Sequence, residues 1–190
     1  DIMAGELQHR VKNTLATVQA IARMSLPDDT VGKEAFISRI LALSRSHDLL
    51  LADNWSGSGI VDVVEQAIHP FGGMDGDRIK VSGPDCRLSS RTSLALSMAL
   101  NELGTNAVKY GALSGDQGMI HIDWDFAGGT EKSRLGFRWQ ETGGPKVSPP
   151  QRKGFGTTLI ERALASEMQG ETAVEYLPSG VIFKCSFPVE

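Results

Sequence analysis

The chain has 190 residues, of which 41% are hydrophobic and 22% charged, and its formal net charge is −4. This mixture is typical of a folded globular protein rather than a disordered one. The acidic balance argues against a nucleic-acid-binding protein, which would favour a basic surface. No apolar run reaches the ~20 residues that a membrane-spanning helix needs, and two cysteines cannot build a disulfide framework. We therefore expect a cytoplasmic protein.

The N-terminal part of the chain has a helical pattern. Apolar residues recur every three to five positions from Ile2, which predicts an amphipathic helix that ends near Met24. The segment Ser25–Asp29 breaks it, and a second run, Phe36–Leu50, follows a heptad-like spacing. Two such helices form an antiparallel hairpin with apolar surface left over, so we expect it to pack on a second copy, as a homodimer, or on another domain. Because the chain begins inside a predicted helix without an initiator Met, we expect a fragment of a longer protein.

A linker rich in glycine and serine, Asn54–Gly59, separates this hairpin from a region of mixed helices and strands. We therefore predict a helical-hairpin domain over residues 1–56 and a second domain over residues 57–190. The second domain is predicted to be an α+β sandwich, with one mixed sheet and helices on one face. Its expected helices are Ile60–Ile68, Ser89–Tyr110 and Gly156–Met168, and its expected strands are Arg78–Val81, Met119–Phe126, Arg134–Trp139, Ala173–Leu177 and Val181–Phe187.

His9 is the first residue that suggests chemistry. At about 100° per residue it lies about 200° from both Leu7 and Val11, so it points away from the apolar stripe of its helix. A solvent-facing imidazole can act as a nucleophile near neutral pH. A surface histidine without any function would show the same pattern.

Polar side chains also recur along the longest predicted helix, at spacings of three and four that place them near one another. An asparagine oxygen can bind Mg²⁺, and a glutamate can take a proton or order water. A solvated helix face is the alternative interpretation. The polar residues are Asn101, Glu102, Asn106, Lys109 and Tyr110.

Two glycine segments complete the set of motifs. Trp139–Pro145 follows a predicted strand, and Gly154–Leu159 opens a predicted helix, where backbone N–H groups can bind an anion. Neither has the spacing of a P-loop or of a Rossmann fingerprint, and each alone is compatible with an ordinary turn. The segment 146–153 between them contains Pro149, Pro150, Arg152 and Lys153, which indicates a mobile, basic flap that could close over phosphates.

In their order along the chain, these motifs resemble those of a two-component sensor histidine kinase. His9 lies where that family has its phosphoacceptor, and Glu102 and Asn106 match residues of the GHKL-type ATP-binding fold shared with gyrase and Hsp90. Among the subfamilies, the chain resembles the HWE kinases through its His-Arg-x-Lys-Asn start, the stretch Asn106–Leu113 and the motif Trp139-x-Glu141. The resemblance covers nearly the whole chain and implies a protein-histidine kinase.

The resemblance also implies roles. His9 would attack the γ-phosphate of ATP, and the phosphoryl group would pass to an Asp on the receiver domain of a response regulator. Asn106 would bind Mg²⁺, Glu141 would hydrogen-bond the adenine amino group, and Gly143 would let the backbone pass close to the base. An upstream sensor domain, outside this chain, would supply the signal. The other nucleotide-binding residues would be Asn101, Lys109, Tyr110, Gly144, Gly154, Gly156, Thr157 and Thr158.

Two positions depart from the family pattern. Asn101 stands where the subfamily has its N-box histidine, and Arg10 stands where many other histidine kinases have an acidic residue. Glu102 is a candidate catalytic residue, but the identity of the general base stays open. Asn13 matches the residue that orients water in bifunctional kinase-phosphatases, which adds phosphatase activity as a hypothesis. The rival interpretations are a phosphotransfer protein with a silent ATP site, a non-enzymatic dimerisation scaffold, and an anti-sigma-factor serine kinase with the same ATP-binding fold.

Overall fold

A computed structural model describes most of the region that the sequence assigns to the second domain. Val18 and Ile40 are helical, one in each helix of the predicted hairpin, and the predicted helix Gly156–Met168 lies outside the described residues. The domain division at residues 56 and 57 stays a prediction. The described residues are 58–74, 76–127, 134–149 and 169–189, together with Val18 and Ile40.

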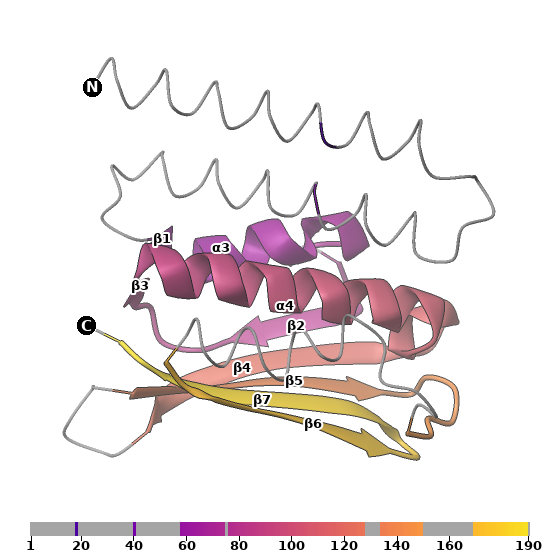
Figure 1. Ribbon diagram of the computed structural model, residues 1–190. Coiled ribbons are helices and arrows are strands. Elements are labelled where there is room, and N and C mark those ends of the chain that lie inside the picture. Colours follow the sequence, from indigo (N-terminus) through magenta and orange to yellow (C-terminus); the bar gives the residue numbers. More distant parts are fainter. Residues whose placement is uncertain are drawn as a thin grey trace.

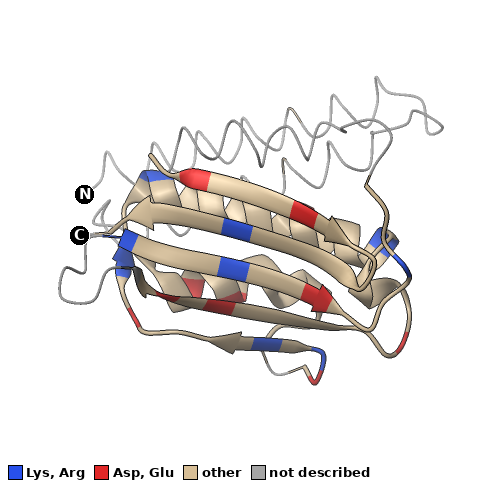
Figure 2. Ribbon diagram, turned by 90° about the horizontal axis from the view of Figure 1, so that it is seen from below, with Lys and Arg blue, Asp and Glu red and all other residues tan. Residues whose placement is uncertain are grey.

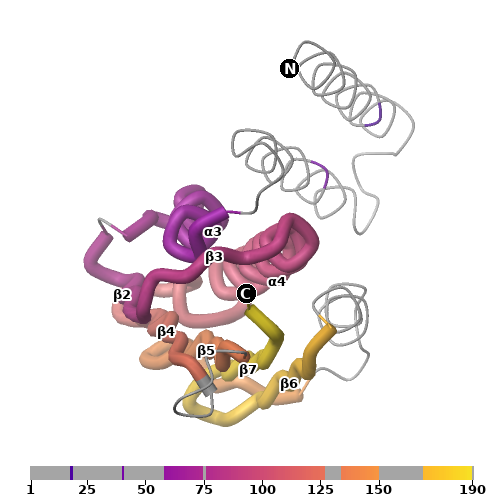
Figure 3. Tube along the Cα trace, turned by 90° about the vertical axis from the view of Figure 1, so that its left-hand side faces the viewer, coloured from indigo at the N-terminus to yellow at the C-terminus, as the bar shows by residue number. Residues whose placement is uncertain are grey.

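A five-stranded mixed sheet forms one layer, and two helices cover one of its faces (Figures 1 and 3). The strand order is β2-β4-β5-β7-β6, in which only β2 and β4 pair in parallel. This confirms the predicted α+β architecture with one mixed sheet. The helices are α3 (Ile60–Ile68) and α4 (Ser90–Lys109), and the strands are β2 (Ile79–Ser82), β4 (Met119–Ala127), β5 (Arg134–Thr142), β6 (Glu171–Leu177) and β7 (Gly180–Pro188).

The alternation of side chains along the strands defines the two faces of this sheet. On β5, Leu135, Phe137 and Trp139 are buried against the helices, whereas Arg138 between them is exposed. Because neighbouring strands keep this register, their inward side chains form one core beneath α3 and α4. The outer face carries charged residues of both signs, scattered over the strands (Figure 2).

Both described helices agree closely with their predicted bounds. α3 begins and ends where the apolar spacing predicted, and it buries Ile60, Val63, Val64 and other residues of one face. α4 begins at Ser90 because the hydroxyl oxygen of Ser89 accepts a hydrogen bond from the Thr92 N–H at 3.2 Å, the geometry of an N-cap. Neither is long and apolar enough to cross a membrane.

One small sheet was not predicted. β1 (Ser58–Gly59) pairs antiparallel with β3 (Arg87–Leu88), so the expected linker ends in a strand. The N–H of Ile60 then donates to the Cys86 carbonyl at 2.9 Å. Two-residue strands joined across such a separation leave no local pattern from which they could be predicted.

Candidate nucleotide-binding site

The C-terminal end of α4 carries three of the predicted nucleotide-binding residues. Asn106 and Lys109 are exposed, and Tyr110 has 73% of its surface exposed. The helix ends here because the N–H groups of Tyr110 and Gly111 both donate to the Asn106 carbonyl, at 2.8 and 3.1 Å. This end of α4 can therefore contact a ligand.

The polar residues of α4 do not share one environment, contrary to the prediction of one common face. Asn101 and Glu102 are only 4% and 7% exposed, and both have interaction partners. The direction of the side chains does not explain the difference, because Glu102 lies four residues before Asn106 and on the same side of the helix. The exposed residues are those at the C-terminal end of α4. Of the predicted set, Asn106, Lys109 and Tyr110 are the residues that α4 presents to solvent.

Glu141 occupies an inward position near the end of β5, where the strand pattern calls for an apolar residue. It is 4% exposed. Its Oε2 accepts a hydrogen bond from the Ala112 N–H at 2.8 Å, and its Oε1 accepts one from the Trp139 indole Nε1 at 3.2 Å. Burial raises the pKa of the Glu141 carboxyl above its ordinary value, and the two hydrogen bonds partly offset that shift.

The predicted C-terminal end of the strand that carries Glu141 was wrong. The strand was predicted to end at Trp139, with Glu141 in a following turn, but β5 continues to Thr142. The two N–H donors explain why a carboxylate is accommodated at this buried position. Glu141 is therefore a residue of β5 and not of the turn that follows it.

The glycines after β5 bring its end against the turn after α4. Gly143 has a φ of 70°, a left-handed conformation that favours glycine. A Cβ on Gly144 would lie 2.7 Å from the Ala112 Cα, so a larger residue there would displace one of the two segments. The structure thus brings together two segments that the sequence identified separately, one around Tyr110 and the other around Glu141.

Arg78, which precedes β2, belongs to this arrangement and was not identified from the sequence. Its guanidinium donates to the Ala112 carbonyl at 2.8 Å and to the Gly118 carbonyl at 2.9 Å. These contacts join residues 34 and 40 positions apart. No local pattern reports contacts of that range.

Several predicted site residues lie outside the described residues, and their roles stay predictions. They are His9, Asn13, Gly154, Gly156, Thr157 and Thr158. Within the described ranges, no group of three or more His, Cys, Asp or Glu side chains could hold a metal ion. The amide of Asn106 remains the candidate Mg²⁺ ligand.

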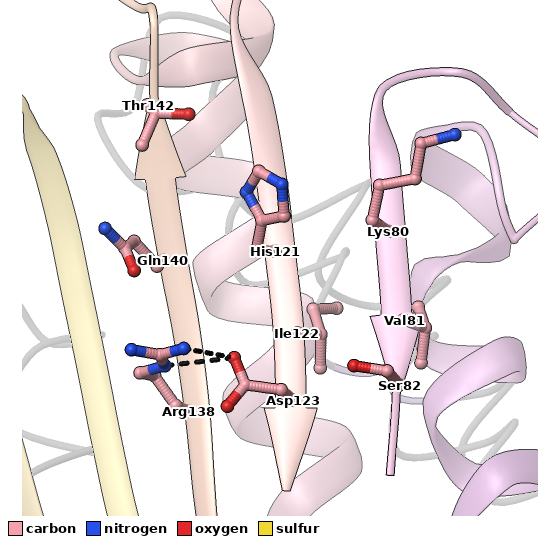
Figure 4. A pocket seen from close by; sticks show the side chains of 9 residues that line it. All are labelled: Lys80, Val81, Ser82, His121, Ile122, Asp123, Arg138, Gln140 and Thr142. Carbon is pink, nitrogen blue, oxygen red and sulfur yellow. Dashed lines mark hydrogen bonds and ion pairs between the residues drawn. The ribbon is translucent and has the colours of Figure 1, made fainter.

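A separate hollow of about 650 Å³ lies on the outer face of the sheet, across β2, β4 and β5 (Figure 4). None of the predicted site residues lines it. Arg138 and Asp123 form an ion pair at 2.9 Å on its floor, and both side chains are well exposed. The lining residues are Lys80, Val81, Ser82, His121, Ile122, Asp123, Arg138, Gln140 and Thr142.

Comparison with solved structures identifies the fold. The histidine kinase domain of a blue-light activated histidine kinase from Erythrobacter litoralis superimposes with a TM-score of 0.66, over 98% of this chain and 90% of that one. The two sequences are 17% identical. The fold is that of a histidine kinase domain.

Sequence comparisons identify the family. A family model described as HWE histidine kinase matches residues 6–85. The blue-light-activated histidine kinase of Brucella anthropi is 38% identical over 191 residues, which cover 99% of this chain and 39% of the relative. That of Brucella ovis is 39% identical with the same coverage. The chain therefore spans about two-fifths of the length of these relatives. It belongs to the HWE family of histidine kinases.

Proposed function

We propose that the chain is the transmitter core of a two-component sensor histidine kinase, which binds Mg-ATP and phosphorylates itself on His9. The phosphoryl group would then pass to an Asp on the receiver domain of a response regulator. Family membership supports the kinase activity. One structural observation carries the nucleotide site: the two subfamily motifs, Asn106–Leu113 and Trp139–Glu141, meet through the hydrogen bond from Ala112 to Glu141.

In this proposal the exposed end of α4 binds the phosphates. The Asn106 amide oxygen would hold Mg²⁺ together with phosphate oxygens, and the Lys109 ammonium would neutralise phosphate charge. A nitrogen of His9 attacks the γ-phosphorus, so that a P–N bond forms while the bond to the β–γ bridging oxygen breaks and ADP leaves. Such phosphoryl transfer depends mainly on positioning and charge neutralisation.

The Glu141 carboxylate can accept a further hydrogen bond, as binding of the adenine amino group would require. Each carboxylate oxygen accepts one hydrogen bond from the chain, and each has a second lone pair. The left-handed backbone at Gly143 follows two residues later, where the family resemblance places the base.

The proposal extends to localisation and assembly. ATP is a cytoplasmic substrate, so this function requires the cytoplasm. The proposal also includes homodimerisation through the predicted helical hairpin.

The test is incubation of the 190-residue chain with Mg²⁺ and γ-labelled ATP. We expect label that is lost in acid and stable in base, absent from a His9→Ala variant. His121→Ala is the matched control, because His121 is exposed on the outer face of the sheet and should leave labelling unchanged. Label that persists in His9→Ala would contradict the assignment of the phosphoacceptor.

Nucleotide binding is measured separately by calorimetry. We expect Mg-ATP to bind the wild-type chain and Asn106→Ala to weaken it strongly. A chain that binds no ATP would instead support the phosphotransfer alternative, in which the ATP site is silent.

A further inference from the structure

A single residue in the turn between α4 and β4, Ala112, has both of its backbone polar groups bound by ionisable side chains. The Ala112 N–H donates to the Glu141 carboxylate, and the Ala112 carbonyl accepts from the Arg78 guanidinium, both at 2.8 Å. Ala112 itself is 1% exposed. Hydrogen bonds in which one partner is ionised are stronger than neutral ones. We call Arg78, Ala112 and Glu141 the Ala112 clamp.

Arg78 fixes more than one point of this turn. Its Nε donates to the Gly118 carbonyl, and its own carbonyl accepts from the Ile120 N–H at 2.8 Å. The planar fork of a guanidinium can hold two carbonyl oxygens in a fixed arrangement, which the point charge of a lysine does less well. Arg78 therefore ties the start of the turn to its end and to the first residues of β4.

The turn also has no space in which to shift. A Cβ on Gly118 would overlap the Ala112 carbonyl, and a Cβ on Gly111 would overlap the Glu141 carboxylate. Gly115, in the same turn, has nothing within 4 Å of its Cβ position. The close packing is thus found around Ala112 and Glu141 and not at Gly115.

We propose that Arg78 is a positioning residue for nucleotide binding, which acts through Ala112 on the end of α4. The proposal rests on the proposed function. Ala112 lies two residues after Tyr110, so a shift of the Ala112 backbone would move the chain that carries Asn106, Lys109 and Tyr110. Glu141 connects the same residue, through its N–H, to the end of β5 and to Gly143.

The experiment compares Mg-ATP affinity across variants of the full chain by calorimetry. Arg78→Ala removes the charge-assisted hydrogen bonds to the Ala112 and Gly118 carbonyls and is expected to raise the dissociation constant at least about tenfold. Arg78→Lys should recover part of the affinity. Arg138→Ala, which removes an exposed arginine from the outer face, should leave it unchanged. An Arg78→Ala variant that binds ATP as tightly as Arg138→Ala would overturn the proposal.

Two further comparisons separate positioning from a general loss of stability. Gly118→Ala is expected to weaken ATP binding as Arg78→Ala does, and Gly115→Ala is not. Val64→Ala creates a cavity in α3, at a fully buried position away from the turn, and should lower the thermal midpoint without weakening ATP binding. If Val64→Ala weakens binding as much as Arg78→Ala, the effect is one of stability and the positioning role is refuted.

Hydrogen exchange of the Ala112 amide tests the clamp without any nucleotide. We expect this amide to exchange at least about tenfold faster in Arg78→Ala than in wild type. Unchanged exchange would overturn the clamp even if ATP binds. A wild-type chain that binds no ATP but shows the faster exchange in Arg78→Ala would refute the proposed function and leave the clamp itself supported.

Discussion

Two of the carboxylates on the sheet, Glu141 and Asp123, have opposite surroundings, and their contrast separates what charge contributes from what burial contributes. Glu141 on β5 points toward the helices, is 4% exposed, and accepts hydrogen bonds from Ala112 and Trp139. Asp123 on β4 points to solvent and pairs with Arg138, a cross-strand neighbour. Solvent screens the ion pair of Asp123 with Arg138. We therefore expect Glu141, which is buried and bound by two neutral N–H groups, to contribute more to the stability of the fold.

The largest expected effect comes from removing the indole that contacts Glu141. Trp139 is fully buried, so Trp139→Ala should destabilise the domain by about 3–5 kcal/mol through the cavity it leaves. Trp139→Phe is the matched variant, because it keeps most of the volume and removes only the Nε1 donor, at a cost of about 1–3 kcal/mol. Urea denaturation measures both. Equal losses for the two variants would show that the hydrogen bond to Glu141, rather than packing, dominates.

Glu141 should also make the stability of the fold depend on pH. Because burial raises the pKa of the Glu141 carboxyl above its ordinary value, the folded state favours the protonated form more than the unfolded chain does. Its contribution to stability is therefore complete below the unfolded-state pKa and is lost as the pH rises through the folded-state pKa. The stability of wild type relative to Glu141→Gln should fall over that window.

Denaturation at a series of pH values from about 4 to 8 measures this difference. The matched control variant is Asp123→Asn, which removes a carboxylate from the outer face of the same sheet. A wild-type chain that gains stability relative to Glu141→Gln as the pH rises would contradict the direction of the pKa shift.

The smallest expected effect is at the outer face. The Arg138 and Asp123 side chains are 48% and 37% exposed, so solvent and salt screen their ion pair. A double-mutant cycle with Arg138→Ala and Asp123→Ala should give a coupling energy below about 1 kcal/mol, and less at high salt. A coupling energy of several kcal/mol would contradict this, because the exposed ion pair would then stabilise the fold as much as the buried carboxylate does.

The local parts of this fold could be predicted from the sequence. The predicted bounds of α3 match both of its ends, and those of α4 differ by one residue at each end. These features depend on residues a few positions apart, so the sequence contains the whole signal. The sequence motifs also identified Glu141 as a site residue, through resemblance to a family.

The parts that were missed depend on distant contacts. Glu141 broke the apolar alternation of β5, and the reason that it fits there is an N–H group 29 positions earlier in the chain. Arg78 resembles any charged residue at the start of a strand, and its two carbonyl partners lie 34 and 40 positions away. The predicted site could therefore be named from motifs, whereas the contacts that hold it together required the structure.

The single parallel pairing in the sheet has a consequence for the order of folding. β4, β5, β7 and β6 are antiparallel neighbours, whereas β2 reaches β4 only across a connection that contains β3 and α4. Closing such a long connection is entropically costly, so we expect β2 to dock after the β4–β5 hairpin, whose connection is short, has formed. Arg78 immediately precedes β2, and its bond to Ala112 closes with that docking. In a chain in which β2 has not yet paired with β4, the hydrogen bond from Arg78 to Ala112 is therefore missing, and we expect the C-terminal end of α4 not yet to bind ATP.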